Sequence, residues 1–244
     1  AIRGVVRFWG ADGVNVLDCR FEPDDGRWIS RSCDGFHGRG REAIWMAKVL
    51  SRAVCEDVSN MYARTLVVVA DEDPEDRQMT MALLQRNNKV KPPSRAVADD
   101  GDRLVFIDTR TGRLLGRTTV NRRTDDGKFT LTRRVPGVSI WRPGDGKRAV
   151  VAYAESVVSS FFIRDCRFMD SMRFGVYCKA RRGAIFNTHF QGLAGHAIMG
   201  ANEPTWPEGP VPSQLWVHDC TFAGNNYSYM GRNRQNLSVD PAEI

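Results

Sequence analysis

Hydrophobic and polar positions recur along this chain in short runs with a long period, and they lack the 3.6-residue spacing of an amphipathic helix. Four segments share an aliphatic residue, then Cys or Thr three positions later, then Phe after two more: VLDCRF (16–21), IRDCRF (163–168), IFNTHF (185–190) and VHDCTF (217–222). An Asp or Asn precedes the Cys or Thr each time. The second and third copies begin 22 residues apart, at 163 and 185. A repeat of this length with Asp, Asn and Gly corners predicts a parallel β-helix, whose coils stack about 4.8 Å apart.

The repeat is interrupted between its first and second copies. A weaker coil fits at WMAKVL (45–50), with Lys48 in the place of the Cys. Further along, GDRLVFIDTRTGRLLGRTTV (101–120) predicts a strand, a tight turn and a second strand. For residues 71–94 we expect a short helix or a mobile loop. We therefore predict an all-β fold in which a right-handed parallel β-helix, over 1–63 and 154–244, carries an inserted antiparallel β-barrel-like module over 64–153.

The repeat length predicts that three acidic residues lie close together. Asp34 stands alone in CDGFH, and Glu56 and Asp57 follow 22 and 23 residues later (34 to 56 and 57). One coil of a β-helix would make them neighbours, and mutual repulsion would then raise the pKa of one of them. Such a carboxyl group can act as a general acid beside an ionised partner, as in glycoside hydrolysis. The spacing also permits Ca²⁺ binding, as in lyases, or a solvated acidic surface.

Two further polar residues join this face when the coils are aligned on their closing apolar residue, which is Leu50, Phe168 or Phe190. In this alignment Phe174 and His196 fall level with Glu56, and Arg173 lies one position earlier. Arg173 is predicted to hold the acidic pair or a substrate hydroxyl, or else to be exposed. His196 is predicted to contact substrate or to be a partly buried structural histidine.

Residues near the carboxylates extend the candidate site. His37 needs a bend in CDGFH to reach the same face as Asp34, where it would contact substrate or make a structural hydrogen bond. Asn60 is either the corner of an Asn ladder or a sugar ligand. The Pro-rich segment NEPTWPEGP (202–210) is predicted to form a loop whose side chains line the site, or else a structural loop. The candidates in this segment are Glu203, Trp206 and Glu208, since an aromatic ring stacks on a sugar face while carboxylates accept from its hydroxyls.

Composition narrows the partners only slightly. The net charge of +6 is scattered along the chain, which fits a solvated surface, an acidic glycan ligand or nucleic acid. The six cysteines form no CxxC pair, so we expect buried free thiols and no zinc site. No apolar run approaches the ~18–20 residues that span a bilayer. The chain begins AIRGVVRFWG, so we expect a processed or excised chain whose parent is secreted or periplasmic.

The order of these motifs resembles glycoside hydrolase family 110, within the wider pectin-lyase-like superfamily. The resemblance rests on CDGFH, EDVSN and GDRLVFIDTRTGRLLGRTTV, then on IRDCRFMDSMRFGVY, IFNTHFQG, NEPTWPEGP and WVHDCTF. It implies a right-handed parallel β-helix with β-barrel insertions. It also implies an exo-acting α-galactosidase that removes terminal α-1,3-linked galactose with inversion. The family pattern has Asp-Asp where this chain has Glu56 and Asp57, and the chain is shorter than complete family members.

From these observations we expect Asp34, Glu56 and Asp57 to be catalytic toward an oligosaccharide or polysaccharide. We expect no cofactor, no metal ion, no nucleic acid partner and no membrane span. Two alternatives stay open. One is a non-catalytic glycan-binding β-helix whose chemistry was lost through Glu56, because the extra methylene displaces a carboxylate. The other is a polyuronide hydrolase or lyase, which the positive charge would favour.

Overall fold

The protein is all-β in the part of the chain that the structure describes. The computed structural model describes residues 6–11, 13–24, 26–30, 34–41, 43–73, 75, 77–84, 89–95, 97–145, 150–157, 160–201, 209, 212–227 and 237–240. These residues include no α-helix, and their helical structure is one 3-10 turn, Pro143–Asp145. Two compact units divide the chain. The first combines the N-terminal stretch up to Tyr62 with Val158–Ala201 and Val211–Asp240, and the second consists mainly of Ala63–Val157.

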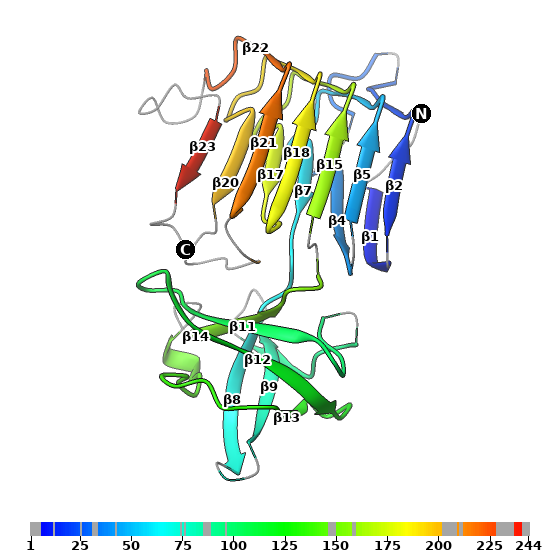
Figure 1. Cartoon of the computed structure of the whole chain (residues 1–244). Helices are drawn as coiled ribbons and strands as arrows, with labels where there is room; N and C mark the ends of the chain where they lie inside the picture. Colours follow the sequence, from blue (N-terminus) through cyan, green and yellow to red (C-terminus); the bar gives the residue numbers. More distant parts are fainter. Residues whose placement is uncertain are drawn as a thin grey trace. The chain divides into compact units, whose positions relative to one another are not determined.

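Three parallel sheets, here named A, B and C, build the first unit (Figure 1). Sheet A contains β1 (Val6–Ala11), β4 (Phe36–Gly40), β7 (Ser59–Met61), β17 (Val176–Cys178), β20 (Ile198–Ala201) and β23 (Leu237–Asp240). Sheet B contains β2 (Val14–Leu17), β5 (Ala43–Ala47), β15 (Ser160–Arg164), β18 (Arg182–Phe186) and β21 (Gln214–His218). Sheet C contains β3 (Arg20–Phe21), β6 (Leu50–Arg52), β16 (Arg167–Met169), β19 (His189–Gln191) and β22 (Thr221–Ala223). The chain visits the sheets in rotation, so three successive strands form one coil that stacks on the next.

The corner between sheets B and C explains the Asp or Asn of the repeat. Backbone φ is positive there in every coil, at Asp18, Lys48, Asp165, Asn187 and Asp219. Asp and Asn tolerate this left-handed conformation better than most residues, because their short side chains hydrogen-bond locally.

The predicted register of the coil at residues 45–50 differs from the observed one. Lys48, with φ of 54°, occupies the corner position, and Val49 takes the place expected for the Cys. In the observed register Leu50 pairs with Arg167, and Ser51 pairs with Phe168. The alignment on Leu50 was therefore wrong by one residue. The error arose because Lys at a left-handed corner is unusual and hid the position of the turn.

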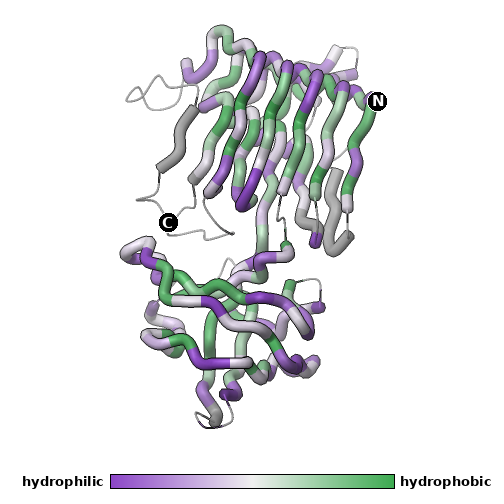
Figure 2. Tube along the Cα trace, in the orientation of Figure 1, coloured by the Kyte–Doolittle hydropathy of each residue, from purple (hydrophilic) through white to green (hydrophobic). Residues whose placement is uncertain are grey.

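Inside the coils, equivalent residues stack on one another. The ring of Phe190 lies 5.6 Å from that of Phe168 and 5.4 Å from that of Phe222, measured between centroids. Bands of apolar and polar residues alternate along the parallel strands (Figure 2). Cys19, Cys166 and Cys220 are free thiols, as predicted, but only Cys166 is fully buried and the other two are partly exposed. Burial raises the pKa of the Cys166 thiol to about 11, which makes it an inert apolar filler.

The second unit is an antiparallel barrel inserted within one coil, between β7 and β15. Six strands close it in the order β8 (Leu66–Asp73), β9 (Gln78–Leu84), β13 (Lys128–Leu131), β12 (Arg113–Arg123), β11 (Arg103–Asp108) and β14 (Val150–Ala154), and β14 pairs back with β8. The short strand β10 (Val90–Lys91) extends β9. The expectation of a helix or mobile loop over 71–94 was therefore wrong. Backbone pairing of β9 with β8 on one side and β13 on the other selects a strand there.

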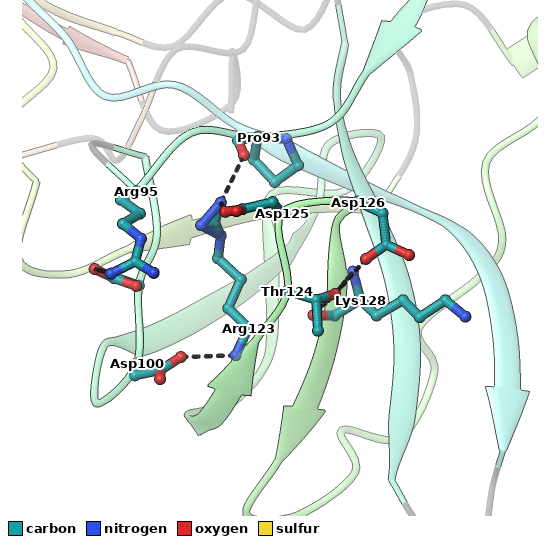
Figure 3. A network of polar contacts seen from close by, with 9 residues as sticks. Pro93, Arg95, Asp100, Arg123, Thr124, Asp125, Asp126 and Lys128 are labelled. Carbon is teal, nitrogen blue, oxygen red and sulfur yellow. Dashed lines mark hydrogen bonds and ion pairs between the residues drawn. The ribbon is translucent and has the colours of Figure 1, made fainter.

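A polar network fastens two loops of the barrel around Arg123 (Figure 3). Its guanidinium donates to the carbonyl of Pro93 at 3.1 Å and to Asp125 at 3.2 Å, and its backbone N–H donates to Asp100 at 2.6 Å. Beside it, the Thr124 hydroxyl donates to Asp126 and accepts from the Lys128 N–H. These contacts tie the two loops together, with the Arg123 Nε left unpartnered among the described residues, so we assign the network to the stability of the barrel.

The coils stack so closely at Gly175 that a side chain there should destabilise the parallel unit. A Cβ at this position would lie 2.4 Å from the carbonyl oxygen of Ala197 and 2.8 Å from the Phe190 ring. We expect Gly175→Ala to lower the free energy of unfolding of the parallel unit by about 2 kcal/mol, measured by urea denaturation. Gly13→Ala is the matched control, because its Cβ would make only an ordinary contact at 3.9 Å. Equal stability of the two variants would contradict the observed stacking.

Candidate active site

The segment CDGFH places Asp34 and His37 side by side. The backbone bends at Gly35, immediately before β4 begins at Phe36. A Cβ at Gly35 would lie 2.5 Å from the carbonyl oxygen of Val58, so the bend requires glycine. Through this bend Asp34 Oδ2 lies 2.6 Å from His37 Nδ1. The bend that the sequence requires is therefore present, and it brings the imidazole against the buried carboxylate.

Asp57 lies one coil further along, as its spacing from Asp34 predicted. Its backbone N–H donates to Asp34 Oδ1 at 3.3 Å. In the same way, Asp57 Oδ1 accepts from the backbone N–H of Phe174 at 3.3 Å. Three successive coils are thus linked by a ladder in which each carboxylate receives the N–H of the equivalent residue in the next coil.

The environment of Asp57 favours its neutral form. Burial and, to a smaller extent, the negative charge of Asp34 raise the pKa of this carboxyl group, the Arg173 and Lys179 charges lower it, and the net pKa is about 7. Arg173 Nε lies 3.6 Å from Asp57 Oδ1. Asp57 Oδ2 is buried and has no hydrogen-bond partner among the described residues. The geometry therefore provides an acid that is partly protonated at neutral pH.

Glu56 is separated from this pair. Its side chain is exposed, whereas Asp34 and Asp57 are both buried. The Ser171 hydroxyl donates to the Glu56 backbone carbonyl at 2.6 Å, which fixes the main chain at this point. With the corrected register, Arg173 and not Phe174 falls level with Glu56. The structure thus links two of the three predicted acidic residues, through the Asp57 backbone N–H and the Asp34 carboxylate, and leaves the side chain of the third exposed.

His37 and Asn60 are cross-strand neighbours in sheet A. They pair directly between β4 and β7, and Tyr177 follows in register on β17. The side chain of His37 is 24% exposed, and its ring meets the edge of Tyr62 at 4.5 Å. Asn60 is only 7% exposed, and its Oδ1 has no hydrogen-bond partner among the described residues. Because Asn60 lies inside a strand beside His and Tyr, the corner of an Asn ladder is excluded.

Arg173 and His196 both pack against the Phe174 ring. The Arg173 guanidinium carbon lies 5.0 Å from the Phe174 centroid, and its side chain is 33% exposed. His196 is buried and stacks on Phe174 with 5.8 Å between ring centroids. Phe174 pairs between Asp57 and His196 in the register, so His196 is one coil further from the carboxylates than Arg173.

Sequence reasoning missed Tyr177 and Lys179. The ammonium group of Lys179 lies 4.1 Å from the Tyr177 ring centroid, and the residue is only 1% exposed. A lysine directly after an apolar strand was a possible signal, but many basic residues follow apolar runs in this chain. The remaining predicted residues, Glu203, Trp206 and Glu208, lie outside the described residues.

No family model and no curated protein indicates a function for this site. Comparison with protein-family models finds no match, and comparison with curated proteins finds none. In the described part of the chain, no group of three His, Cys, Asp or Glu side chains is placed to hold a metal ion. No helix there has the length and hydropathy required to cross a bilayer.

Proposed function

We propose that this protein is an exo-acting glycoside hydrolase, and that its parallel unit is a right-handed β-helix. The observation that carries the proposal is the buried pair Asp34 and Asp57 on adjacent coils, one of them with a pKa of about 7. A carboxyl group held neutral near an acidic partner is the arrangement that glycosidases use to protonate a leaving group. The resemblance to glycoside hydrolase family 110 makes a terminal α-1,3-linked galactose the first substrate to test.

In the proposed reaction Asp57 donates its proton to the glycosidic oxygen as the bond to the anomeric carbon breaks. Water attacks the opposite face of that carbon and gives its proton to a carboxylate, which inverts the configuration. Glu56 is the candidate base, because its carboxylate is exposed. Asp34 is too close to Asp57 to serve as the base of an inverting enzyme. Equivalent residues one coil apart stack at about 4.8 Å, whereas the two carboxyl groups of inverting glycosidases lie ~6.5–9.5 Å apart.

Access to Asp57 requires a side chain to move. The carboxyl group is fully buried, and the partly exposed Arg173 guanidinium lies against it at 3.6 Å. We assign Arg173 as the group that a substrate displaces, with His37 and Asn60 contacting sugar hydroxyls. Asn60 Oδ1 accepts no hydrogen bond from the described residues and is suited to receive one from a hydroxyl.

A second function, glycan binding without turnover, is favoured by two observations. The Oδ1 atoms of Asp34 and Asp57 both accept backbone N–H groups, as structural carboxylates would. On the outer face of sheet B, the half-exposed Trp45 and Trp216 share a row with Phe162. The Trp45 and Phe162 rings lie 5.1 Å apart, and such exposed rings can stack on sugars.

A polyuronide hydrolase or lyase is the third reading. The net charge of +6 and the two cations beside Asp57, Arg173 and Lys179, would suit an acidic sugar. A secreted or periplasmic location accords with any of these glycan substrates. The free thiols at the five described cysteines are less usual in such oxidising compartments, although Cys166 and Cys178 are buried and protected.

One screen separates the three functions. Purified protein is incubated with nitrophenyl α- and β-glycosides, an α-1,3-linked galactosyl disaccharide and uronan polymers, and products are followed by absorbance and NMR. Release of β-galactose from the α-linked disaccharide supports the proposal and its inversion. Retention on immobilised glycan without product supports the binding function, and unsaturated uronides indicate a lyase. Absence of turnover on every glycoside at pH 4–9 would overturn the hydrolase assignment.

Glu56→Gln tests the proposed base on whichever glycoside is cleaved. The substitution keeps the size of the side chain and removes its charge, so we expect kcat to fall about 100-fold with little change in stability. Asp170→Asn is the control, because Asp170 is an exposed carboxylate whose ion-pair partner is the exposed Arg52. A kcat unchanged in Glu56→Gln would assign the base elsewhere.

A further inference from the structure

Two aromatic rings support the cation that contacts Asp57. The Arg173 guanidinium carbon lies 5.0 Å from the Phe174 centroid and 5.8 Å from the Tyr177 centroid. The two rings meet edge to face, with 5.2 Å between their centroids. A planar guanidinium over aromatic faces is held by the ring quadrupole, and the attraction grows when water is excluded. The rings therefore restrict the conformations of a long side chain that is otherwise one-third exposed.

Lys179 packs on one of the same two rings, that of Tyr177. Its ammonium nitrogen lies 4.1 Å from the Tyr177 centroid, and hardly any of the residue is exposed to solvent. A buried cation is costly unless its surroundings compensate the charge. Tyr177 thus carries two cations, of which one is at the surface and contacts Asp57 and the other is enclosed.

We propose that Tyr177 is a positioning residue that acts through Arg173 by orienting its guanidinium toward Asp57, and that Lys179 adds a second, fixed positive charge that acts on Asp57 itself. Their effect on catalysis rests on the proposed function. Their effect on the protonation of Asp57 does not, because it depends only on the arrangement of charges around a buried carboxyl group.

The groups that surround Asp57 fix the direction of the effect. On the β4 side lie Asp34 and, behind it, His37. On the β17 side lie Arg173 and Lys179, whose charges both lower the pKa of Asp57. Exposed Glu56 precedes it in the chain. Removing or displacing either cation removes an effect that lowers the pKa of Asp57, while burial and the Asp34 charge continue to raise it. The pKa of Asp57 must therefore rise.

The test measures the carboxyl group directly and needs no substrate. Infrared difference spectra between the wild-type protein and its Asp57→Asn variant isolate the protonated carboxyl C=O band of Asp57, which is then titrated with pH. We expect Tyr177→Leu, which removes the ring, to raise the titration midpoint by roughly one pH unit. Tyr177→Phe retains the ring and should titrate like the wild type.

Tyr177→Leu leaves a cavity at a buried site and could destabilise the fold, so a second variant tests the proposal without changing Tyr177. Lys179→Met keeps most of the side-chain volume and removes the charge, and it should raise the midpoint by roughly half a pH unit. Lys179→Arg should restore it. Midpoints equal to the wild type in both Tyr177→Leu and Lys179→Met would overturn the proposal. If the midpoints shift but no glycoside is ever cleaved, the positioning role stands and the proposed hydrolase function fails.

Discussion

Replacing Asp57 with Asn is expected to lower kcat on the cleaved glycoside about 1,000-fold, which is the usual contribution of a general acid. The carboxamide has nearly the shape of the carboxyl group and can still accept the Phe174 N–H, so the ladder between coils should persist. It cannot donate a proton to a leaving group. A nitrophenyl leaving group needs little protonation, so the loss should be smaller on nitrophenyl glycosides than on the natural disaccharide.

The comparison between the two substrates separates an acid from a merely structural residue. Steady-state kinetics of Asp57→Asn and of the control Asp170→Asn on both substrates provide the measurement. Glycan affinity, measured by calorimetry, should change little in either variant. If Asp57→Asn hydrolyses the disaccharide at the wild-type rate, the acid lies elsewhere and the glycan-binding function becomes the better account of the ladder.

The same substitution should raise the melting temperature at pH 8. Burial raises the pKa of Asp57 from 3.8 to about 7 in the folded protein, so the native state holds this proton more tightly than the unfolded chain. That preference stabilises the fold fully below pH 3.8, is lost progressively as the pH rises to about 7, and is absent above it. At about 1.4 kcal/mol for each pH unit, the loss is at most about 4 kcal/mol.

Thermal unfolding between pH 4 and pH 9 measures this effect. The wild-type melting temperature should fall across the range relative to Asp57→Asn, whose neutral amide does not titrate. The two proteins should be similar near pH 4 and differ most near pH 8, where the ionised Asp57 is buried. Asp170→Asn, at an exposed position, should follow the wild type. Parallel curves for wild type and Asp57→Asn would show that Asp57 is not held neutral in the fold.

Much of the parallel unit could be predicted from the sequence because its repeat combines two physical requirements. Phe168, Phe190 and Phe222 mark the stacked interior, and Asp or Asn marks the left-handed corner before it. At Lys48, where the corner residue is neither Asp nor Asn, the predicted register was wrong by one residue. The barrel strand β9 was missed because its sequence, QMTMALL, is equally compatible with a helix, and only pairing with β8 and β13 selects the strand.

The candidate site was predictable only where it follows the repeat. Asp34 and Asp57 are equivalent residues of adjacent coils, so spacing sufficed to bring them together. The exposure of Glu56 and the burial of Lys179 are set by turn residues that do not recur in the other coils. Tyr177 was unremarkable in sequence, because its importance lies in the two cations on its ring.

The position of the barrel has a consequence for the order of folding. In sheet B, β5 and β15 are direct neighbours, with Met46 opposite Ile163, although the whole barrel lies between them in the chain. Within the barrel, β8 and β14 pair with Leu66 opposite Ala152, so the two ends of the insertion emerge side by side. An unfolded insertion would impose the closure entropy of a long loop on the β5–β15 pairing, whereas a folded barrel reduces it to that of a short connection. Early folding of the barrel would therefore act as a clamp that brings the two halves of the interrupted coil together, and any domain with adjacent termini could serve in its place.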